Sequence, residues 1–369
     1  MREESKMVEN DRRIILEGGS FFDGTGFGAE VDRVCEVVFN TSVVGYQEIL
    51  SDPSYAYQAV VMTYPLIGNY GMADDDYEAQ RPAAGALIVR DYCDEPSNFR
   101  SAETLSTVMR RFGIPGIAGI DTRTLTRSIR DGGSRRALIT KASTSIEEGL
   151  AIIAATPVPT DAVSFASRRE PHVYRTAHER HHVVAIDCGM KANIVRSLSE
   201  RGCRVSAVPW NTRAEDIMRL KPDGVLVSNG PGDPADVPEV AATVRGLVGT
   251  VPMFGICLGH QIIARAYGAR TYKLKFGHRG GNHPVRNLLT GRVEITSQNH
   301  SYAVDGKSLA ATPLSVTHVN VLDGTVEGLS CERDRVMSVQ YHPDSAPGPQ
   351  DSAYLFDEFV AMMEGARHA

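Results

Sequence analysis

The second half of the chain alternates apolar runs with segments of helical spacing, and this alternation restricts the fold more than any other feature. Four short, largely apolar runs are each followed by a helical segment, at residues 183–186, 205–208, 224–228 and 251–256. Strands that are apolar throughout are buried on both faces, as in parallel sheets covered by helices. The pattern predicts an α/β domain with an open, mostly parallel sheet over residues 182–369, ending in an amphipathic helix at 351–363.

Residues 13–145 show a different pattern. Polar segments, or segments containing Gly and Pro, separate strand candidates at 13–22, 34–41, 59–64 and 86–90. Because no strand–helix unit repeats, we interpret this part as a β-rich α+β N-terminal domain, preceded by a polar tail at residues 1–12. Residues 24–28 are rich in glycine but lack the spacing of a dinucleotide-binding loop, and we interpret them as a turn.

Residues 146–181 interrupt both patterns, and a chain of 369 residues is long enough for two domains. Prolines break the stretch 156–160, and residues 168–182 are polar and rich in histidine, so we place the inter-domain linker here. These histidines have no carboxylate or cysteine partner at ligand spacing, and the six cysteines form no Cys-x-x-Cys pair. We therefore expect no bound metal and no disulfide framework.

Composition excludes several classes of function. A net charge of −6, without a basic tract interleaved with aromatic residues, argues against nucleic-acid binding. No apolar run approaches the ~20 residues of a membrane helix, the N-terminus lacks the apolar centre of a signal peptide, and scattered cysteines fit a reducing compartment. We expect a cytoplasmic protein.

A helix is predicted over residues 121–132, with Asp121 as N-cap and Gly132 as its end. Arg123, Arg127 and Arg130 would share one face of this helix. We interpret the arginine stripe as solvated surface, with a docking face for an acidic partner as the alternative.

The sequence Gly255-Ile256-Cys257-Leu258-Gly259 lies where the fourth apolar strand turns directly into a helix. Such a corner exposes the central residue and needs small neighbours. At a helix N-terminus the partial positive charge favours thiolate over thiol. Cys257 is therefore a candidate nucleophile, and a buried cysteine that fills space is the alternative.

Two further segments follow strands of the same predicted sheet. The loop 229–234 contains Gly230 and Gly232 and can present backbone N–H groups, which with the Leu258 N–H would form an oxyanion hole. His342 and Asp344 follow the strand 336–341 and point the same way in extended chain, so the carboxylate can orient the imidazole as a base. Taken singly, each segment is better explained as a simple turn.

These motifs resemble the class I, triad-type glutamine amidotransferases, and specifically the small-subunit family of carbamoyl-phosphate synthetase. In the second half the resemblance rests on residues 228–234, 255–261, 275–284 and 298–300. In the first half it rests on residues 36–42, 45–50, 52–55, 63–69 and 119–123. The first-half motifs make the resemblance specific to this family.

The resemblance implies a flavodoxin-like fold for residues 182–369 and hydrolysis of glutamine to glutamate and ammonia. Cys257 would form a glutamyl thioester, with His342 as acid and base and Asp344 as its partner. The family's glutamine contacts fall on Ser54, Gly230, Gly232, Leu258, Gln261, Asn299, Ser301 and Tyr302. Ser54 would come from the N-terminal domain, so both domains would close the site.

The resemblance also implies a partner. Ammonia would pass through a tunnel to a large ATP-using subunit, which makes carbamoyl phosphate from bicarbonate for arginine and pyrimidine biosynthesis. The N-terminal domain would dock this subunit in a heterodimer or a higher oligomer. ATP, Mg²⁺ and K⁺ would bind the large subunit, and no cofactor is expected in this chain.

Three positions depart from the commoner family pattern. Asp344 replaces a glutamate that is one methylene longer, Ser301 replaces a glycine, and Tyr302 replaces a phenylalanine. The shorter Asp344 predicts a longer or water-bridged contact with His342, and Ser301 is compatible with the site unless that position needs positive φ. A non-catalytic scaffold or regulatory subunit, and an amidotransferase subunit of another synthase, are the alternative functions.

Overall fold

The computed structural model describes residues 10–367, so most of the expected polar tail (1–12) lies outside the described residues. The chain divides into two compact units. The first comprises Met1–Ser51 and Tyr57–Pro159, and the second comprises Asp52–Ala56 and Thr160–Ala369. Within residues 10–367, no helix is both long enough and apolar enough to cross a membrane.

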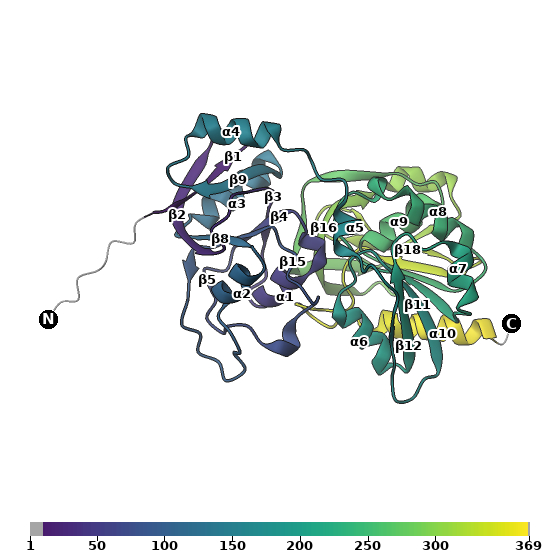
Figure 1. Cartoon of the computed structure of the whole chain (residues 1–369). Helices are drawn as coiled ribbons and strands as arrows, with labels where there is room; N and C mark the ends of the chain where they lie inside the picture. The colour runs from purple at the N-terminus through teal and green to yellow at the C-terminus, as the bar shows by residue number, and fades with distance from the viewer. Residues whose placement is uncertain (1–9, 368–369) are drawn as a thin grey trace. The chain divides into compact units, whose positions relative to one another are not determined.

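The first unit is built on a closed barrel with the strand order β1-β2-β8-β6-β4-β3-β9 (Figure 1). Its strands are β1 (Arg12–Leu16), β2 (Phe21–Gly28), β3 (Arg33–Asn40), β4 (Gln58–Met62), β6 (Ala86–Ile88), β8 (Pro115–Ala118) and β9 (Arg135–Lys141). Pairing is parallel between β3, β4, β6 and β8 and antiparallel elsewhere. The predicted strands are confirmed, whereas the closure into a barrel was not predicted.

The turn predicted at residues 24–28 is wrong, because these residues belong to β2. A Cβ on Gly24 would lie 2.2 Å from the carbonyl oxygen of Ala118, and one on Gly26 would lie 2.7 Å from Cγ of Arg12. Glycine is therefore needed for β2 to pair closely with β1 and β8. The glycines indicate close backbone approach in this strand.

Helices α1 (Tyr46–Ser51), α2 (Leu105–Arg111), α3 (Thr122–Gly132) and α4 (Ile146–Ala155) complete the first unit, with a short pair of strands, β5 (Leu66–Ile67) and β7 (Asp91–Tyr92). The predicted helix at 121–132 is confirmed as α3, since Asp121 accepts a hydrogen bond from the Thr124 N–H at 2.9 Å. Leu125 and Ile129 are buried, and the three arginines of the stripe are exposed. The arginine stripe is therefore exposed in this chain, which is compatible with both interpretations.

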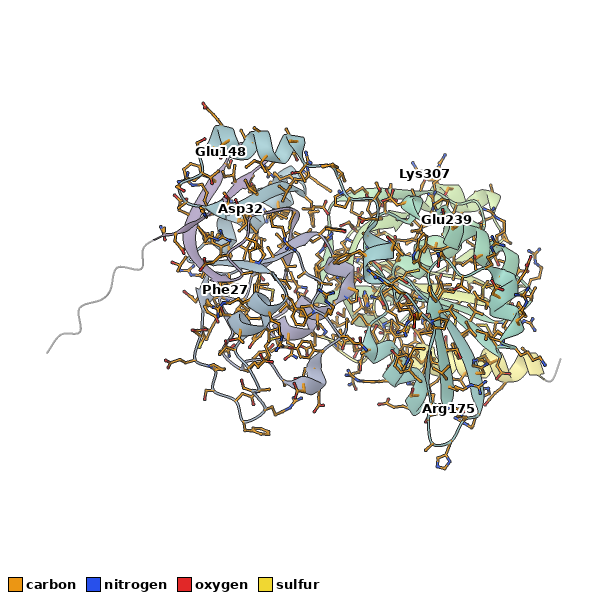
Figure 2. All side chains as sticks on the ribbon, in the orientation of Figure 1. Phe27, Asp32, Glu148, Arg175, Glu239 and Lys307 are labelled. Atoms are coloured by element: carbon orange, nitrogen blue, oxygen red, sulfur yellow. The ribbon has the colours of Figure 1, made fainter. Side chains whose placement is uncertain are left out.

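Residues 146–181, the predicted linker, contain the boundary between the two units at Pro159 and Thr160, and much of the segment is regular structure. Ile153 of α4 packs on Ile15 and Leu138 of the barrel, while Glu148 projects from the exposed face of the same helix (Figure 2). Helix α5 (Ala162–Ala166) and strand β10 (His172–Tyr174) belong to the second unit. Apolar residues such as Ile153 are buried by this packing, which is why the segment is structured.

The second unit contains a ten-stranded sheet with the order β10-β12-β11-β13-β14-β19-β18-β17-β15-β16. Its other strands are β11 (His181–Asp187), β12 (Cys203–Pro209), β13 (Gly224–Val227), β14 (Met253–Ile256), β15 (Thr271–Asn287), β16 (Val293–Val304), β17 (Ser315–Asn320), β18 (Val326–Cys331) and β19 (Val336–Val339). The sheet is parallel only from β12 to β19, and the remaining pairs are antiparallel. The expected mostly parallel sheet is thus limited to the part where helices connect the strands, since short turns produce antiparallel pairs.

Helices cover both faces of the parallel part. Helices α7 (Ala214–Arg219), α8 (Pro238–Leu247) and α9 (Leu258–Ala266) contribute to one apolar cluster, and α6 (Ala192–Glu200) and α10 (Tyr354–Arg367) contribute to the other (Figure 1). Leu355, Phe356 and Phe359 of the predicted terminal helix are buried. The loops after β11, β13, β14 and β19 therefore gather at the carboxyl edge of the parallel strands, where ligands bind in open α/β sheets.

Candidate active site

Cys257 lies at the corner between β14 and α9 in a strained conformation, with φ 54° and ψ −105°. Non-glycine residues rarely adopt such backbone angles, which cost about 1–3 kcal/mol and cluster at functional sites. A Cβ on Gly259 would lie 2.0 Å from the carbonyl oxygen of Val227, and one on Gly255 would lie 2.8 Å from that of Gly259. The small neighbours predicted for a nucleophile corner are therefore sterically required.

The thiol of Cys257 is buried and lies near β16. Its side chain is 2 % exposed, and Sγ donates to the carbonyl oxygen of Asn299 at 3.5 Å. The Cys257 N–H donates to Val339 of β19 at 2.9 Å, which attaches the corner to the strand that leads to His342. Cys257 directly precedes the first turn of α9, so the thiol lies at a helix N-terminus.

His342 and Asp344 follow β19, as predicted, and both side chains are buried. His342 Nδ1 lies 3.3 Å from Asp344 Oδ1, close enough for an ion pair. The orientation of these two atoms does not meet hydrogen-bond geometry. The shorter aspartate therefore reaches the imidazole directly, at a distance longer than an ideal hydrogen bond.

Lys191 is a member of this group that sequence reasoning missed. Its side chain is buried, and Nζ lies 2.6 Å from Asp344 Oδ2 and 2.5 Å from the carbonyl oxygen of Ala346. The residue lies just after the carboxyl end of β11, beside the predicted active-site edge. Its place after a predicted parallel strand could have marked Lys191 as a site residue. A lysine at such a position is usually solvated, so its burial was not expected.

The charges of the three side chains are coupled. Burial alone would raise the pKa of Asp344, but the Lys191 ammonium and the His342 ring lower it well below its usual range. Burial and the Lys191 charge oppose protonation of His342, yet its contacts with Asp344 and Cys257 outweigh them and raise its pKa to about 10. The contacts of His342 with Asp344 and Cys257 thus favour a protonated imidazole, as a general acid requires.

The glycine loop after β13 lies against the nucleophile corner. A Cβ on Gly230 would meet Leu258 Cδ2 at 2.9 Å and the Cys188 carbonyl oxygen at 2.2 Å, and Gly232 has φ +87°. Because β13 and β14 are paired neighbours, their following residues are brought together. Gly230 and Leu258 are therefore adjacent, as an oxyanion hole requires.

Ser54 packs with the second unit rather than with the barrel that surrounds it in sequence. It belongs to the 3₁₀ helix η1 (Pro53–Tyr55), and its Oγ accepts a hydrogen bond from Asn229 Nδ2 at 2.9 Å. Asp52 caps η1 and accepts from Asn299 Nδ2 at 3.1 Å. Ser54 thus lies beside the glycine loop. It belongs to the second unit, which also contains Cys257, and not to the first unit as predicted.

The remaining predicted glutamine contacts lie on α9 and β16. Gln261 Nε2 donates to the carbonyl oxygen of Tyr302 at 2.8 Å and to Gln340 Oε1 at 2.9 Å. Ser301 Oγ accepts a hydrogen bond from Arg279 Nη2. Ser301 does not have positive φ, so the backbone at this position accommodates serine in place of glycine.

Comparisons with known proteins give two family matches. Residues 184–362 match the model described as Glutamine amidotransferase class-I, and residues 14–139 match Carbamoyl-phosphate synthase small chain, CPSase domain. The chain is 51% identical over 354 residues to the carbamoyl phosphate synthase small chain of Fusobacterium nucleatum, covering 96% of this chain and 98% of that protein. It is 52% identical over 357 residues to the carbamoyl phosphate synthase pyrimidine-specific small chain of Halalkalibacterium halodurans, covering 97% and 98%.

Proposed function

Because the chain belongs to the carbamoyl phosphate synthase small chain family, we propose that Cys257, His342 and Asp344 hydrolyse the side-chain amide of glutamine. As a member, it is the glutaminase subunit of a carbamoyl-phosphate synthase. The match of residues 14–139 to the small-chain domain argues against an amidotransferase subunit of another synthase. The observation that carries the residue assignment is the strained backbone at Cys257. It is joined by buried His342, whose pKa is raised in part by its contact with Cys257.

In the proposed first half-reaction, the Cys257 thiolate attacks the amide carbon of glutamine and forms a carbon–sulfur bond. Charge on the amide oxygen is stabilised by the N–H groups of Leu258 and the Gly230 loop. His342 then donates its proton to the leaving nitrogen, and ammonia departs as the carbon–nitrogen bond breaks. The product is a glutamyl thioester on Cys257, and His342 is left neutral.

In the second half-reaction, neutral His342 takes a proton from water, which attacks the thioester carbon. The carbon–sulfur bond breaks, glutamate leaves, and the thiolate–imidazolium pair is restored. Asp344 keeps the imidazole oriented, and Lys191 keeps Asp344 ionised, which is consistent with the 2.6 Å contact between them.

For glutamine itself, we assign eight contacts around the nucleophile. These are Ser54, Gly230, Gly232, Leu258, Gln261, Asn299, Ser301 and Tyr302. The assignment is supported by two contacts: Ser54 Oγ accepts from Asn229, the residue before Gly230, and the Cys257 thiol contacts the carbonyl oxygen of Asn299.

A small chain implies a large-subunit partner. We assign to that partner the binding of ATP, Mg²⁺ and K⁺ and the synthesis of carbamoyl phosphate from bicarbonate, with ammonia delivered through a tunnel. The first unit carries the small-chain domain and is the proposed docking part. The cysteines of the chain are free thiols, which suits a reducing, cytoplasmic location.

The test is glutamate release from glutamine by the purified chain, alone and with its large subunit. We expect release that Cys257→Ala abolishes, while synthesis from added ammonia by the complex persists. If Cys257→Ala leaves glutamine-dependent synthesis unchanged, the chain is a scaffold or regulatory subunit and the proposal fails. Co-purification with a different synthase would contradict the partner.

A further inference from the structure

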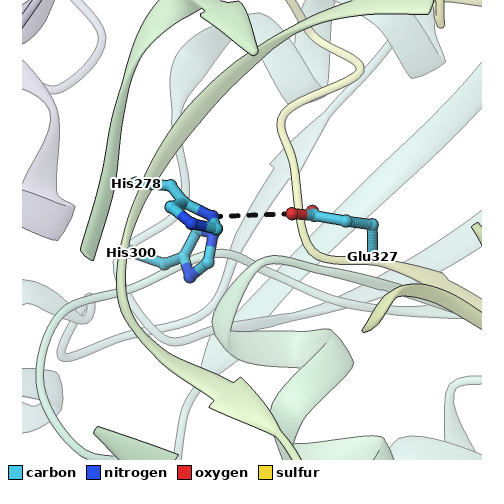
Figure 3. A group of neighbouring side chains, drawn as sticks. All are labelled: His278, His300 and Glu327. Atoms are coloured by element: carbon cyan, nitrogen blue, oxygen red, sulfur yellow. Dashed lines mark ion pairs between the residues drawn. The ribbon is translucent and has the colours of Figure 1, made fainter. Parts of the chain in front are cut away.

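Beyond the glutaminase residues, a second group of buried titratable side chains lies in the antiparallel part of the sheet. His278 comes from β15, His300 from β16 and Glu327 from β18, and all are buried. Each residue offers one atom that could bind a metal ion, and these three atoms lie within 4.8 Å of one another. Figure 3 shows the two rings side by side with the Glu327 carboxylate directed toward them.

His278 lies between two carboxylates. Its Nε2 lies 2.8 Å from Asp323 Oδ2, and its Nδ1 faces Glu327 Oε1 at 3.6 Å without a hydrogen-bond partner. A carboxylate on the outer nitrogen orients a histidine so that the inner nitrogen points at a metal. The buried Glu327 Oε2 also has no hydrogen-bond partner among the described residues.

His300 faces an oxygen atom from each ring nitrogen. Its Nδ1 is 2.8 Å from the carbonyl oxygen of Tyr302, and its Nε2 is 2.8 Å from Gln298 Oε1. Because the Tyr302 carbonyl oxygen can only accept, His300 Nδ1 carries a proton. With that proton on Nδ1, the Nε2 lone pair faces the amide oxygen of Gln298.

The Gln298 amide is held in this orientation. Its Nε2 donates to Thr296 Oγ1 at 3.2 Å, and the Thr296 hydroxyl already donates to the carbonyl oxygen of His283 at 2.9 Å. If the amide were rotated by 180°, Gln298 Oε1 would face Thr296 Oγ1. That hydroxyl has a single proton, which it already donates to His283. Two acceptors 2.8 Å apart repel each other unless a cation lies between them.

A proton on His278 explains only part of this group. Such a proton provides no partner for Glu327 Oε2 or for the facing pair of His300 Nε2 and Gln298 Oε1. A divalent cation would neutralise both carboxylates and occupy the facing lone pairs.

We infer that His278, His300 and Glu327 bind one divalent transition-metal ion, with the Gln298 carbonyl as a fourth ligand. Two imidazoles with one carboxylate select Zn²⁺ or Co²⁺ over Mg²⁺ and Ca²⁺, which prefer oxygen ligands. Zn–N bonds of about 2.0–2.1 Å place tetrahedral ligand atoms about 3.3 Å apart. The 3.6 Å between His278 Nδ1 and Glu327 Oε1 is close to that spacing. Ligand atoms that are up to 4.8 Å apart must close by up to about 1.5 Å to reach it.

The ion would have a structural role. His300 lies between Asn299 and Ser301 on β16, the strand that contacts Cys257, so metal binding would hold this strand to β15 and β18. The site is independent of the proposed glutamine chemistry, and its test does not require catalysis.

The experiment uses the full chain with Cys257→Ala, which removes the reactive thiol as a competing zinc ligand. After treatment with a chelator, Zn²⁺ is titrated calorimetrically, and bound metal is measured after dialysis. We expect one ion per chain. His278→Gln and Glu327→Gln should each weaken binding by more than tenfold, and Asp323→Asn by about 10–100-fold as an outer partner. His172→Gln, an exposed histidine on β10, is the matched control and should bind as the parent does.

Co²⁺ provides an independent readout, because its absorption reports the ligands. A tetrahedral spectrum without a sulfur-to-cobalt band supports the site, whereas a sulfur band assigns the ion to a remaining cysteine and overturns it. Absence of binding, or binding that Glu327→Gln and Asp323→Asn both leave unchanged, also overturns it. Circular dichroism of each variant verifies the fold, and the partly exposed Asp323 keeps the test valid if a core variant does not fold.

Discussion

Two histidines of the second unit, His342 and His278, are each buried beside an aspartate, yet their surroundings differ in one charge. Next to His342, the third group is the Lys191 ammonium, which lies 2.6 Å from Asp344. Next to His278, the third group is a second carboxylate, Glu327, at 3.6 Å. The first arrangement balances its charges and leaves the imidazole available to exchange a proton with Cys257. The second places two carboxylates around one imidazole, which suits the proposed cation.

The sign of the third group thus separates proton transfer from cation binding for similar histidine–aspartate pairs. Strain adds to the difference, since positive φ occurs at Cys257 but not at His278 or His300. Strained backbone at a reactive residue is typical of catalytic sites. The comparison can be tested by changing each histidine and each neighbouring charge.

The largest expected effect is on catalysis. His342→Ala should lower kcat for glutamine hydrolysis by about 10²–10⁴-fold, the usual contribution of a general acid–base group. His278→Gln, without contact to the thiol, should cause a much smaller loss. Steady-state glutamate release measures both. Comparable losses would mean that the two histidines are not functionally distinct.

Asp344→Ala should also slow hydrolysis, but about tenfold less than His342→Ala, because orienting a base contributes less than being one. The measurement is kcat for each variant under saturating glutamine. Equal losses would show that the 3.3 Å contact is indispensable for the reaction.

Lys191→Met should lower the free energy of unfolding by about 3–5 kcal/mol, because it leaves the buried Asp344 carboxylate without its cation. Urea unfolding followed by circular dichroism measures the change. The double variant Lys191→Met/Asp344→Leu removes both charges and should recover most of the loss. A single variant as stable as the parent would contradict the role of Lys191.

Stability should depend on pH through both histidines. A pKa raised above the ordinary value of 6.5 contributes stability that is complete below pH 6.5 and is lost as the pH rises through the folded-state value. That value is about 9 for His278 and about 10 for His342. In metal-free protein, the unfolding free energy should fall between pH 6.5 and 10. In His278→Gln, the decrease between pH 6.5 and 9 should be smaller, because the contribution of His278 is absent. A pH-independent free energy in this range would contradict the proposed charges.

The smallest effect concerns β16, which connects the two histidine sites. Ser301→Gly should destabilise the protein by about 0.5–1 kcal/mol, since glycine loses more conformational entropy in a strand. Urea unfolding measures it, with Ser315→Gly at the start of β17 as a comparison. A gain in stability would indicate that Ser301 is strained despite its ordinary φ.

Much of the site was predictable because it follows a topological rule. The apolar run before Cys257 predicts a strand, parallel strands end at one edge, and the glycine loop and His342 also follow strands of that edge. Lys191 follows the first such strand, but its neutralisation of Asp344 depends on burial that a sequence does not display. Ser54 illustrates a different limit, because residues 52–56 pack with a unit other than the one that contains their neighbours in sequence.

By itself, the sequence determined the family, the parallel core, the strand–helix corner proposed for the nucleophile and the position of the proposed base, since each follows from local pattern or motif. Only the tertiary structure decided the barrel closure, the antiparallel half of the sheet and the charges around each histidine. Strand pairing in β2 depends on the close approach of Ala118 to Gly24, residues distant in sequence. The roles of His342 and His278 depend on which buried charge lies nearest, and burial with long-range contacts exists only in the folded chain.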